Sequence, residues 1–207
     1  LGEAPVFRYN DLPRGFEDCT LWVWTDQGRP VALQKVEAKV DGVPRRPGWS
    51  FCFTSFSTDT LSAHWSTGRA FTSTEPGVTF TELPKAPEPA EASTQRRLQA
   101  RRLAAAFSGR IFDVVTDVEE EMRFLPKPVF EYDEPGSKLY CGAIFGLTAH
   151  GTNPDAFVCI EIRESRAGTP RWHFAAARMT NGGVSLRYGE QETCRFEPVK
   201  AGNGVFP

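Results

Sequence analysis

An internal repeat is the feature of this sequence that most constrains its fold. Residues 5–11, Pro-Val-Phe-Arg-Tyr-Asn-Asp, return as residues 128–134, Pro-Val-Phe-Glu-Tyr-Asp-Glu. Six blocks match in the same order with only one inserted and one deleted residue, which predicts a duplication. The later matches are residues 21–25 with 144–148, Gly28 with Gly151, Pro30 with Pro154, Glu37 with Glu161, Trp49 with Trp172, Phe51 with Phe174, and 61–65 with 184–188.

Each copy has the pattern of short antiparallel strands. Runs rich in β-branched and aromatic residues alternate with turn formers, such as Asp-Gln-Gly at 26–28 and Asp-Gly at 41–42. In the second copy, Asn-Gly-Gly at 181–183 predicts a hairpin. Connections this short are typical of antiparallel meanders, because a parallel crossover needs a dozen or more residues.

A linker and a helix are expected between the copies. Three prolines within residues 83–89 predict an extended linker. The helix should begin near Ser93 or Thr94, whose hydroxyls can cap it, and should end at residues 108–109, Ser-Gly. Its expected buried face is formed by Ala100, Leu103, Ala104 and Phe107.

The chain therefore divides into a first β repeat over residues 1–82, a Pro-rich linker and helix over 83–127, and a second β repeat over 128–207. Within the middle segment, residues 110–115 should form one more strand, and residues 119–121 fit either a short helical turn or a polar loop. We predict a mostly β fold in which two homologous antiparallel units pack about a pseudo-twofold axis, as a sandwich or a barrel-like arrangement, with one connecting α-helix. Two separate small barrels are the alternative.

Composition and spacing argue against several classes of function. A net charge of −2 is unlike that of a nucleic-acid binder, and no apolar run is long enough to cross a bilayer. The three histidines and five cysteines show no metal-ligand spacing, and neither a phosphate-binding glycine loop nor a Gly-x-Ser-x-Gly motif occurs. No cofactor and no metal site are therefore predicted.

Two pairs of equivalent residues are candidates for a site. Glu37 and Glu161 would approach each other if their strands lay beside the pseudo-twofold axis, and paired carboxylates hydrolyse glycosides. Otherwise each is a solvent-facing strand residue with a cross-strand partner. Trp65 and Tyr188 lie near turns, where an exposed ring could stack on a sugar or anchor a protein partner. Packing in the core is the alternative for both rings.

The other aromatic residues are assigned to the interior. Trp49 and Trp172 each adjoin a strand that carries phenylalanine, so both are predicted in the cores. Trp22 and Trp24 share one face of a strand whose other face carries residues 21 and 23, Leu and Val. This pattern is typical of a central strand that is covered on both faces.

An arginine cluster marks the expected helix. Arg97 and Arg101, together with Arg96, Arg102 and Arg110, should form its outward side. Such a face is either simply solvated or docks onto an acidic surface.

The motifs of both copies resemble a group of proteins from planctomycete bacteria that have no known activity. The residues that carry this resemblance are 5–11, 21–24 and 28–33 in the first copy and 124–128, 151–154, 171–172 and 177–180 in the second. Because many members of that group carry export signals, the resemblance implies a location outside the cytoplasm. The chain begins with Leu rather than Met, which fits either a removed signal peptide or a chosen chain boundary.

These observations favour a non-catalytic binding or assembly module, a subunit of a larger extracytoplasmic complex. Its expected partners are other protein chains, with carbohydrate as the second candidate and Trp65, Tyr188, Arg97 and Arg101 as the expected contacts. The runner-up is a polysaccharide-directed hydrolase that uses Glu37 and Glu161.

Overall fold

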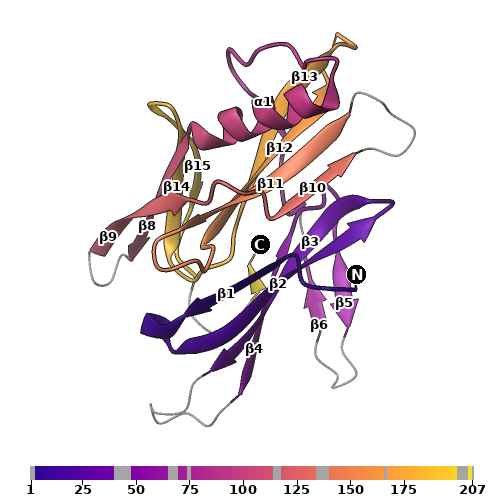
Figure 1. Cartoon of the computed structure of the whole chain (residues 1–207). Helices are drawn as coiled ribbons and strands as arrows, with labels where there is room; N and C mark the ends of the chain where they lie inside the picture. The colour runs from indigo at the N-terminus through magenta and orange to yellow at the C-terminus, as the bar shows by residue number, and fades with distance from the viewer. Residues whose placement is uncertain are drawn as a thin grey trace.

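Two large β-sheets and one α-helix make up the part of the chain that the computed structural model describes, residues 3–39, 48–64, 70–73, 76–113, 118–133, 140–165, 167–199 and 205–206 (Figure 1). The first sheet has the order β1-β2-β3-β4-β16, and the second has the order β15-β14-β8-β9-β11-β12-β13-β7, with β10 also paired to β11. The expectation of a mostly β fold with one connecting helix is confirmed.

The elements have the following bounds. The first sheet contains β1 (Phe7–Asp11), β2 (Phe16–Asp26), β3 (Arg29–Lys39), β4 (Trp49–Ser55) and β16 (Val205–Phe206), and a 3-10 turn, η1 (Leu12–Arg14), joins β1 to β2. A small ribbon contains β5 (Ser62–His64) and β6 (Ala70–Thr72). The remaining elements are β7 (Thr81–Glu82), α1 (Ser93–Ala105), β8 (Phe107–Asp113), β9 (Val118–Phe124), β10 (Phe130–Asp133), β11 (Cys141–Thr148), β12 (Ala156–Glu164), β13 (Pro170–Arg178), β14 (Gly183–Tyr188) and β15 (Gln191–Phe196).

The first sheet is an antiparallel meander, except that β16 pairs with β4 in parallel. Between β2 and β3 the turn consists of Gln27 and Gly28, with φ of 47° and 87°. A two-residue hairpin turn with positive φ at both residues matches the right-handed twist of the strands that it joins. The expected turn at residues 26–28 is therefore confirmed.

Strands β10 to β13 form a second meander with the registers of β1 to β4. The matched strand positions of the first four strands of each copy are paired alike, including strand positions on either side of both gaps. The last block does not correspond, because residues 62–64 pair with β6 in the small ribbon, whereas residues 183–188 pair with β8 and β15 in the second sheet. Corresponding pairs are Phe7↔Leu21 and Phe130↔Ile144, Leu21↔Lys35 and Ile144↔Cys159, and Ala38↔Trp49 and Ile162↔Trp172.

The two meanders pack face to face as a sandwich. One hydrophobic core lies between them and takes buried side chains from both, so the alternative of two separate barrels is wrong. Its members include Tyr9, Cys19, Leu21, Val23 and Leu33 from the first sheet and Tyr132, Ile144, Phe157, Cys159 and Ala175 from the second.

A second core lies on the opposite face of the second sheet, beneath α1 (Figure 1). Ala100, Leu103 and Ala104 are buried there as predicted, and α1 packs on β11, β12 and β8. The predicted start at Ser93 is confirmed, but the predicted hydroxyl cap and the predicted end at residues 108–109 are wrong. Its N-cap is Ala92, without a side-chain hydrogen bond, and it ends at Ala105, because the following residues turn into β8.

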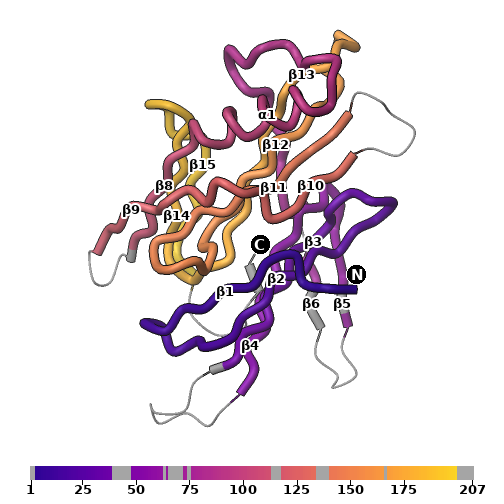
Figure 2. The backbone as a smooth tube through the Cα atoms, viewed as in Figure 1, coloured from indigo at the N-terminus to yellow at the C-terminus, as the bar shows by residue number. Residues whose placement is uncertain are grey.

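The middle segment of the chain belongs mostly to the second sheet. The strand expected at 110–115 is β8, which begins earlier, and residues 119–121 lie in β9 rather than in a helical turn or a loop. Figure 2 shows how the chain leaves the first sheet after β4 and passes through the β5–β6 ribbon. It then enters the second sheet at β7, which pairs with β13.

Residues 181–183 do not form the predicted hairpin. Strands β13 and β14, which flank them, occupy different places in the second sheet and do not pair with each other. Glycine is needed here for close packing instead. A Cβ atom added to Gly183 would lie 2.3 Å from the ring of Phe112.

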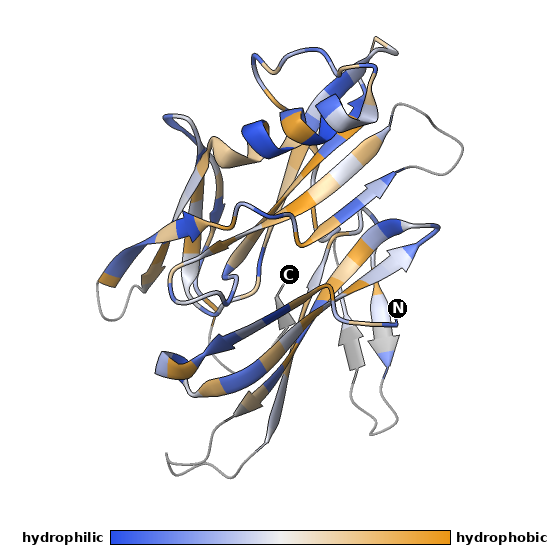
Figure 3. Cartoon of the chain, in the orientation of Figure 1, coloured by the Kyte–Doolittle hydropathy of each residue, from blue (hydrophilic) through white to orange (hydrophobic). Residues whose placement is uncertain are grey.

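The resulting layers are α1, the second sheet and the first sheet. All eight residues of β11 are buried, because the strand is covered on both faces, whereas burial alternates along β2. Apolar and polar residues can be followed along both sheets in Figure 3. Among the described residues, no helix is long and apolar enough to span a membrane.

Candidate functional site

The outer face of the first sheet carries a group of exposed large apolar side chains. We call the five residues Trp22, Trp24, Val36, Trp49 and Phe51 the aromatic face. Strand pairing places them on one side of β2, β3 and β4, opposite to the core. Trp49 is 64% exposed, Phe51 46% and Trp24 36%. Contiguous apolar surface of this kind is characteristic of interaction sites.

A shallow groove of about 330 Å³ lies within the aromatic face, and its walls include Trp22, Val36 and Trp49. The indole N–H of Trp22 donates to Thr20 Oγ1 at 3.0 Å, which satisfies its hydrogen bond inside the groove. Asp18 at the rim forms an ion pair with Arg8 of β1 at 2.6 Å. The groove thus offers an apolar surface in which the polar groups of Asp18, Thr20, Trp22 and Gln34 already have partners.

The prediction that both repeat-equivalent tryptophans lie in cores is right for one of them. Trp172 is 1% exposed and lies in the core beneath α1, but Trp49 is largely exposed. The two side chains point to the outer faces of their sheets, and only the second sheet has a helix on that face. The error at Trp49 therefore comes from tertiary cover and not from the strand assignment.

The prediction that β2 is covered on both faces fails for the same reason. Leu21 and Val23 are buried in the core between the sheets, as expected. On the other face Trp22 is half-buried and Trp24 is exposed. The pattern of a strand that is covered on both faces is present, but the cover on the outer side is partial: Ala32, Gln34 and Phe53 on that side are buried, whereas Trp24 is exposed.

Glu37 and Glu161 are both buried, so the solvent-facing interpretation is wrong. Glu161 accepts hydrogen bonds from Arg29 of the first sheet, from Arg163 at 3.1 Å and from the hydroxyl of Tyr132. Glu37 accepts a hydrogen bond from the hydroxyl of Tyr9 at 2.9 Å and contacts the Cys52 sulfur at 3.9 Å. A buried tyrosine–glutamate pair thus occurs at the same place in each copy.

The structure does not bring the two glutamates together. Glu161 is bound to Arg29, which begins β3, whereas Glu37 lies near the end of the same strand. Eight residues of strand separate these positions along β3, roughly 26 Å at the usual rise. Carboxylates that hydrolyse glycosides lie within about 10 Å of each other. The geometry therefore gives no support to a paired-carboxylate hydrolase.

A buried lysine connects the two sheets at the end of the interface away from the Arg29–Glu161 contact. Lys35 Nζ donates to Asn153 Oδ1 and to the carbonyl oxygen of Pro154, both at 2.6 Å. Asn153 in turn donates to Asp11 at 3.0 Å. Arg29 of the first sheet binds the second sheet at one end of the interface, and Asn153 of the second copy binds the first sheet at the other end. Polar contacts therefore connect the two meanders at both ends.

Alkaline pH is expected to destabilise the fold through the two buried tyrosines. Burial, reinforced by Glu37, raises the pKa of Tyr9, and burial, reinforced by Cys159 and Glu161, raises the pKa of Tyr132. Both stay protonated when folded but ionise near pH 10 when unfolded, so stability is kept below pH 10 and lost above it. Each should cost about 1.4 kcal/mol per pH unit above about pH 10.

Urea unfolding between pH 8 and 11 measures this loss, with Tyr9→Phe and Tyr132→Phe as matched controls. Each Phe variant should show a shallower decline, because it has no phenol to ionise. Titration of both phenols near pH 10 in the folded protein, seen by ultraviolet absorbance, would contradict the prediction.

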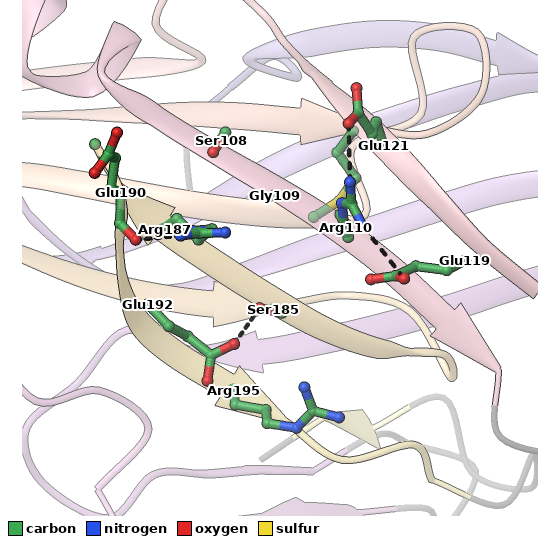
Figure 4. A pocket seen from close by; sticks show the side chains of 12 residues that line it. Ser108, Gly109, Arg110, Glu119, Glu121, Ser185, Arg187, Glu190, Glu192 and Arg195 are labelled. Atoms are coloured by element: carbon green, nitrogen blue, oxygen red, sulfur yellow. Dashed lines mark hydrogen bonds and ion pairs between the residues drawn. The ribbon is translucent and has the colours of Figure 1, made fainter.

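A charged hollow of about 760 Å³ lies over β8, β9, β14 and β15 (Figure 4). Three arginines and four glutamates line it, so its charges nearly balance. Arg110 binds Glu119 at 3.3 Å and Glu121 at 3.2 Å, and Ser185 donates to Glu192 at 2.7 Å. Such paired surface charges leave little net charge to select a ligand.

The remaining predicted contacts are not gathered into one site. Trp65 lies outside the described residues, and Tyr188 packs on Phe107 at 5.0 Å between ring centroids, at the edge of the core beneath α1. Arg97 and Arg101 are exposed on α1, where Arg97 lies 3.6 Å from Asp133.

The arginine face is interrupted by one buried member. Arg96 is 4% exposed and donates to the carbonyl oxygens of Ala90 and Glu91 at 3.1 and 2.5 Å. It anchors the segment before the helix, so the expectation that every arginine of the cluster points outward is wrong at this position.

Among the described residues no three His, Cys, Asp or Glu side chains are placed to hold a metal ion, and all five cysteines are free. No protein-family model, no curated protein and no solved structure matches the chain.

Proposed function

We propose that this protein is a non-catalytic binding and assembly module that joins other protein chains through its aromatic face. The observation that carries the proposal is the exposure of Trp49, Phe51 and Trp24 on a sheet face whose equivalent in the second copy is covered. Large aromatic side chains dominate the energetics of protein interfaces, so a cluster of this size is a strong binding surface.

The paired polar groups around the aromatic face support a protein partner over a sugar. Carbohydrate recognition needs free donors and acceptors beside the stacking ring. Here the indole N–H groups of Trp22 and Trp24 donate to Thr20 and Gln34, both at 3.0 Å. Covering the face therefore leaves the indole donors of Trp22 and Trp24 paired, which favours an apolar protein surface.

The test is the composition of the complex formed by the protein in the organism that makes it. Light scattering with mass spectrometry should detect a stable complex with another chain. Trp49→Ser should abolish it, whereas Leu98→Ser, at a leucine that is 54% exposed on α1, should leave it intact. A clean monomer, or a complex that persists in Trp49→Ser, would contradict the proposed function.

Two further parts of the proposal concern origin and location. We attribute the equal registers of the two meanders to duplication of one β unit, supported by the six matched sequence blocks. We also place the module outside the cytoplasm, on the resemblance described above. Cell fractionation tests the location.

A further inference from the structure

The internal repeat shows how this chain covers a sheet face of this kind. On the second sheet, the outer face of β11, β12 and β13 lies beneath α1, and Leu83 and Phe107 belong to the same core. The helix presents a stripe of small and medium apolar side chains, Ala100, Leu103 and Ala104, to the sheet. An amphipathic helix is thus the element that completes the sandwich on that side.

The aromatic face holds the same positions of the first copy. The equivalents of its residues on the second sheet are all buried in the core beneath α1. Corresponding residues are Trp22 and Phe145, Trp24 and Leu147, Val36 and Ile160, Trp49 and Trp172, and Phe51 and Phe174. These five pairs match in position and in apolar character, and they differ in cover. The neighbouring residues Ala32, Gln34 and Phe53 on the same face of the first sheet are buried, so the uncovered part is the region around Trp24, Trp49 and Phe51.

We propose that the aromatic face binds an amphipathic α-helix of a partner protein, laid across β2, β3 and β4 as α1 is laid across the second sheet. The inference rests on the proposed function and names the kind of partner. The groove of about 330 Å³ gives the side chains of such a helix a place between Trp22 and Trp49. Because the aromatic rings are large, the helix should present mainly alanine with one or two leucine or isoleucine side chains at helical spacing.

Charge also selects this occupant. The only charged side chain that lines the groove among the described residues is Asp18, and it is already paired with Arg8. A nucleic acid or another polyanion would find no free cation there. A helix that turns an uncharged stripe toward the sheet and its charges toward solvent meets no unpaired charge.

Photo-crosslinking in the organism that makes the protein tests this inference. Trp49 and Trp24 are replaced, in separate variants, by the photoreactive residue p-benzoylphenylalanine, with Leu98 replaced in the same way as the control. We expect both face variants to capture one segment of another protein, at partner positions spaced by three, four or seven residues with apolar side chains. The control at Leu98 should not capture that segment.

A second measurement uses the captured segment as a synthetic peptide. It should become helical on binding, and Trp49→Ser should weaken its binding about thirtyfold or more, as is usual for a central aromatic anchor.

The possible failures are distinct. Capture of the aromatic face of a second copy, or of partner residues at alternate positions as in a strand, would overturn the helix while leaving an assembly module. A protein that captures no other chain and co-purifies with a glycan would overturn the proposed function itself.

Discussion

Trp172→Ala is expected to destabilise the fold by about 3–5 kcal/mol, whereas Trp49→Ala should change stability by less than about 1 kcal/mol. The two residues hold the same position in the two copies, opposite Ile162 and Ala38 in the neighbouring strand. Truncating Trp172 opens a cavity in the core beneath α1, and truncating Trp49 removes a side chain that is already mostly in water. Urea unfolding of both variants measures the difference.

Trp172→Phe is the matched control for volume. It keeps most of the ring and removes an indole N–H that has no hydrogen-bond acceptor among the described residues. The free energy of unfolding should therefore fall less in Trp172→Phe than in Trp172→Ala. Similar losses for Trp172→Ala and Trp49→Ala would mean that the aromatic face is covered within the isolated chain. That result would remove the basis for a partner at this face.

Glu161→Gln should cost about 2–4 kcal/mol and Glu37→Gln about 1 kcal/mol or less. Glu161 Oε1 accepts charge-assisted hydrogen bonds from Arg29 and Arg163, and the neutral amide loses that attraction. Glu37 accepts its hydrogen bond from the neutral hydroxyl of Tyr9, which a glutamine carbonyl can replace. Urea unfolding at pH 7 of the two variants measures these costs.

A double-mutant cycle shows whether the cost at Glu161 comes from the contact between the sheets. Arg29→Gln in the Glu161→Gln background should cost less than it does in the wild type, because the ion pair is already broken. Equal losses at Glu161 and Glu37 would contradict the prediction, since they would mean that the arginines contribute nothing. Neither glutamine change should alter binding at the aromatic face, which lies on the other side of the first sheet.

Much of the fold could be predicted from local pattern. The repeat blocks, with both gaps, predicted the equivalence that the registers show, because strand pairing preserves sequence spacing. The turn at residues 26–28 and the buried stripe of α1 follow from short-range chemistry in the same way. The C-terminal end of α1 could not be predicted, because Phe107 begins a strand that pairs with β14.

The candidate site was harder to predict because exposure depends on cover. The sequence marks Trp22 and Trp24 as residues of a strand with two apolar faces, and that is a correct statement of their pattern. It does not say where the cover comes from. The sequence does contain one signal: two units with matching strand patterns are accompanied by a single predicted helix, which can cover only one of their outer faces.

The sequence by itself determined the mostly β fold, the strands of the two meanders, the repeat of their residue pattern and the apolar character of both sheet faces. These properties depend on side chains that are close in the sequence or on a period of two. Only the tertiary structure decided that α1 covers Trp172 and leaves Trp49 exposed, and that Glu37 and Glu161 lie at opposite ends of one interface. Such outcomes depend on how whole sheets and the helix pack together, because burial is a property of the surfaces that meet and not of the residues that carry them.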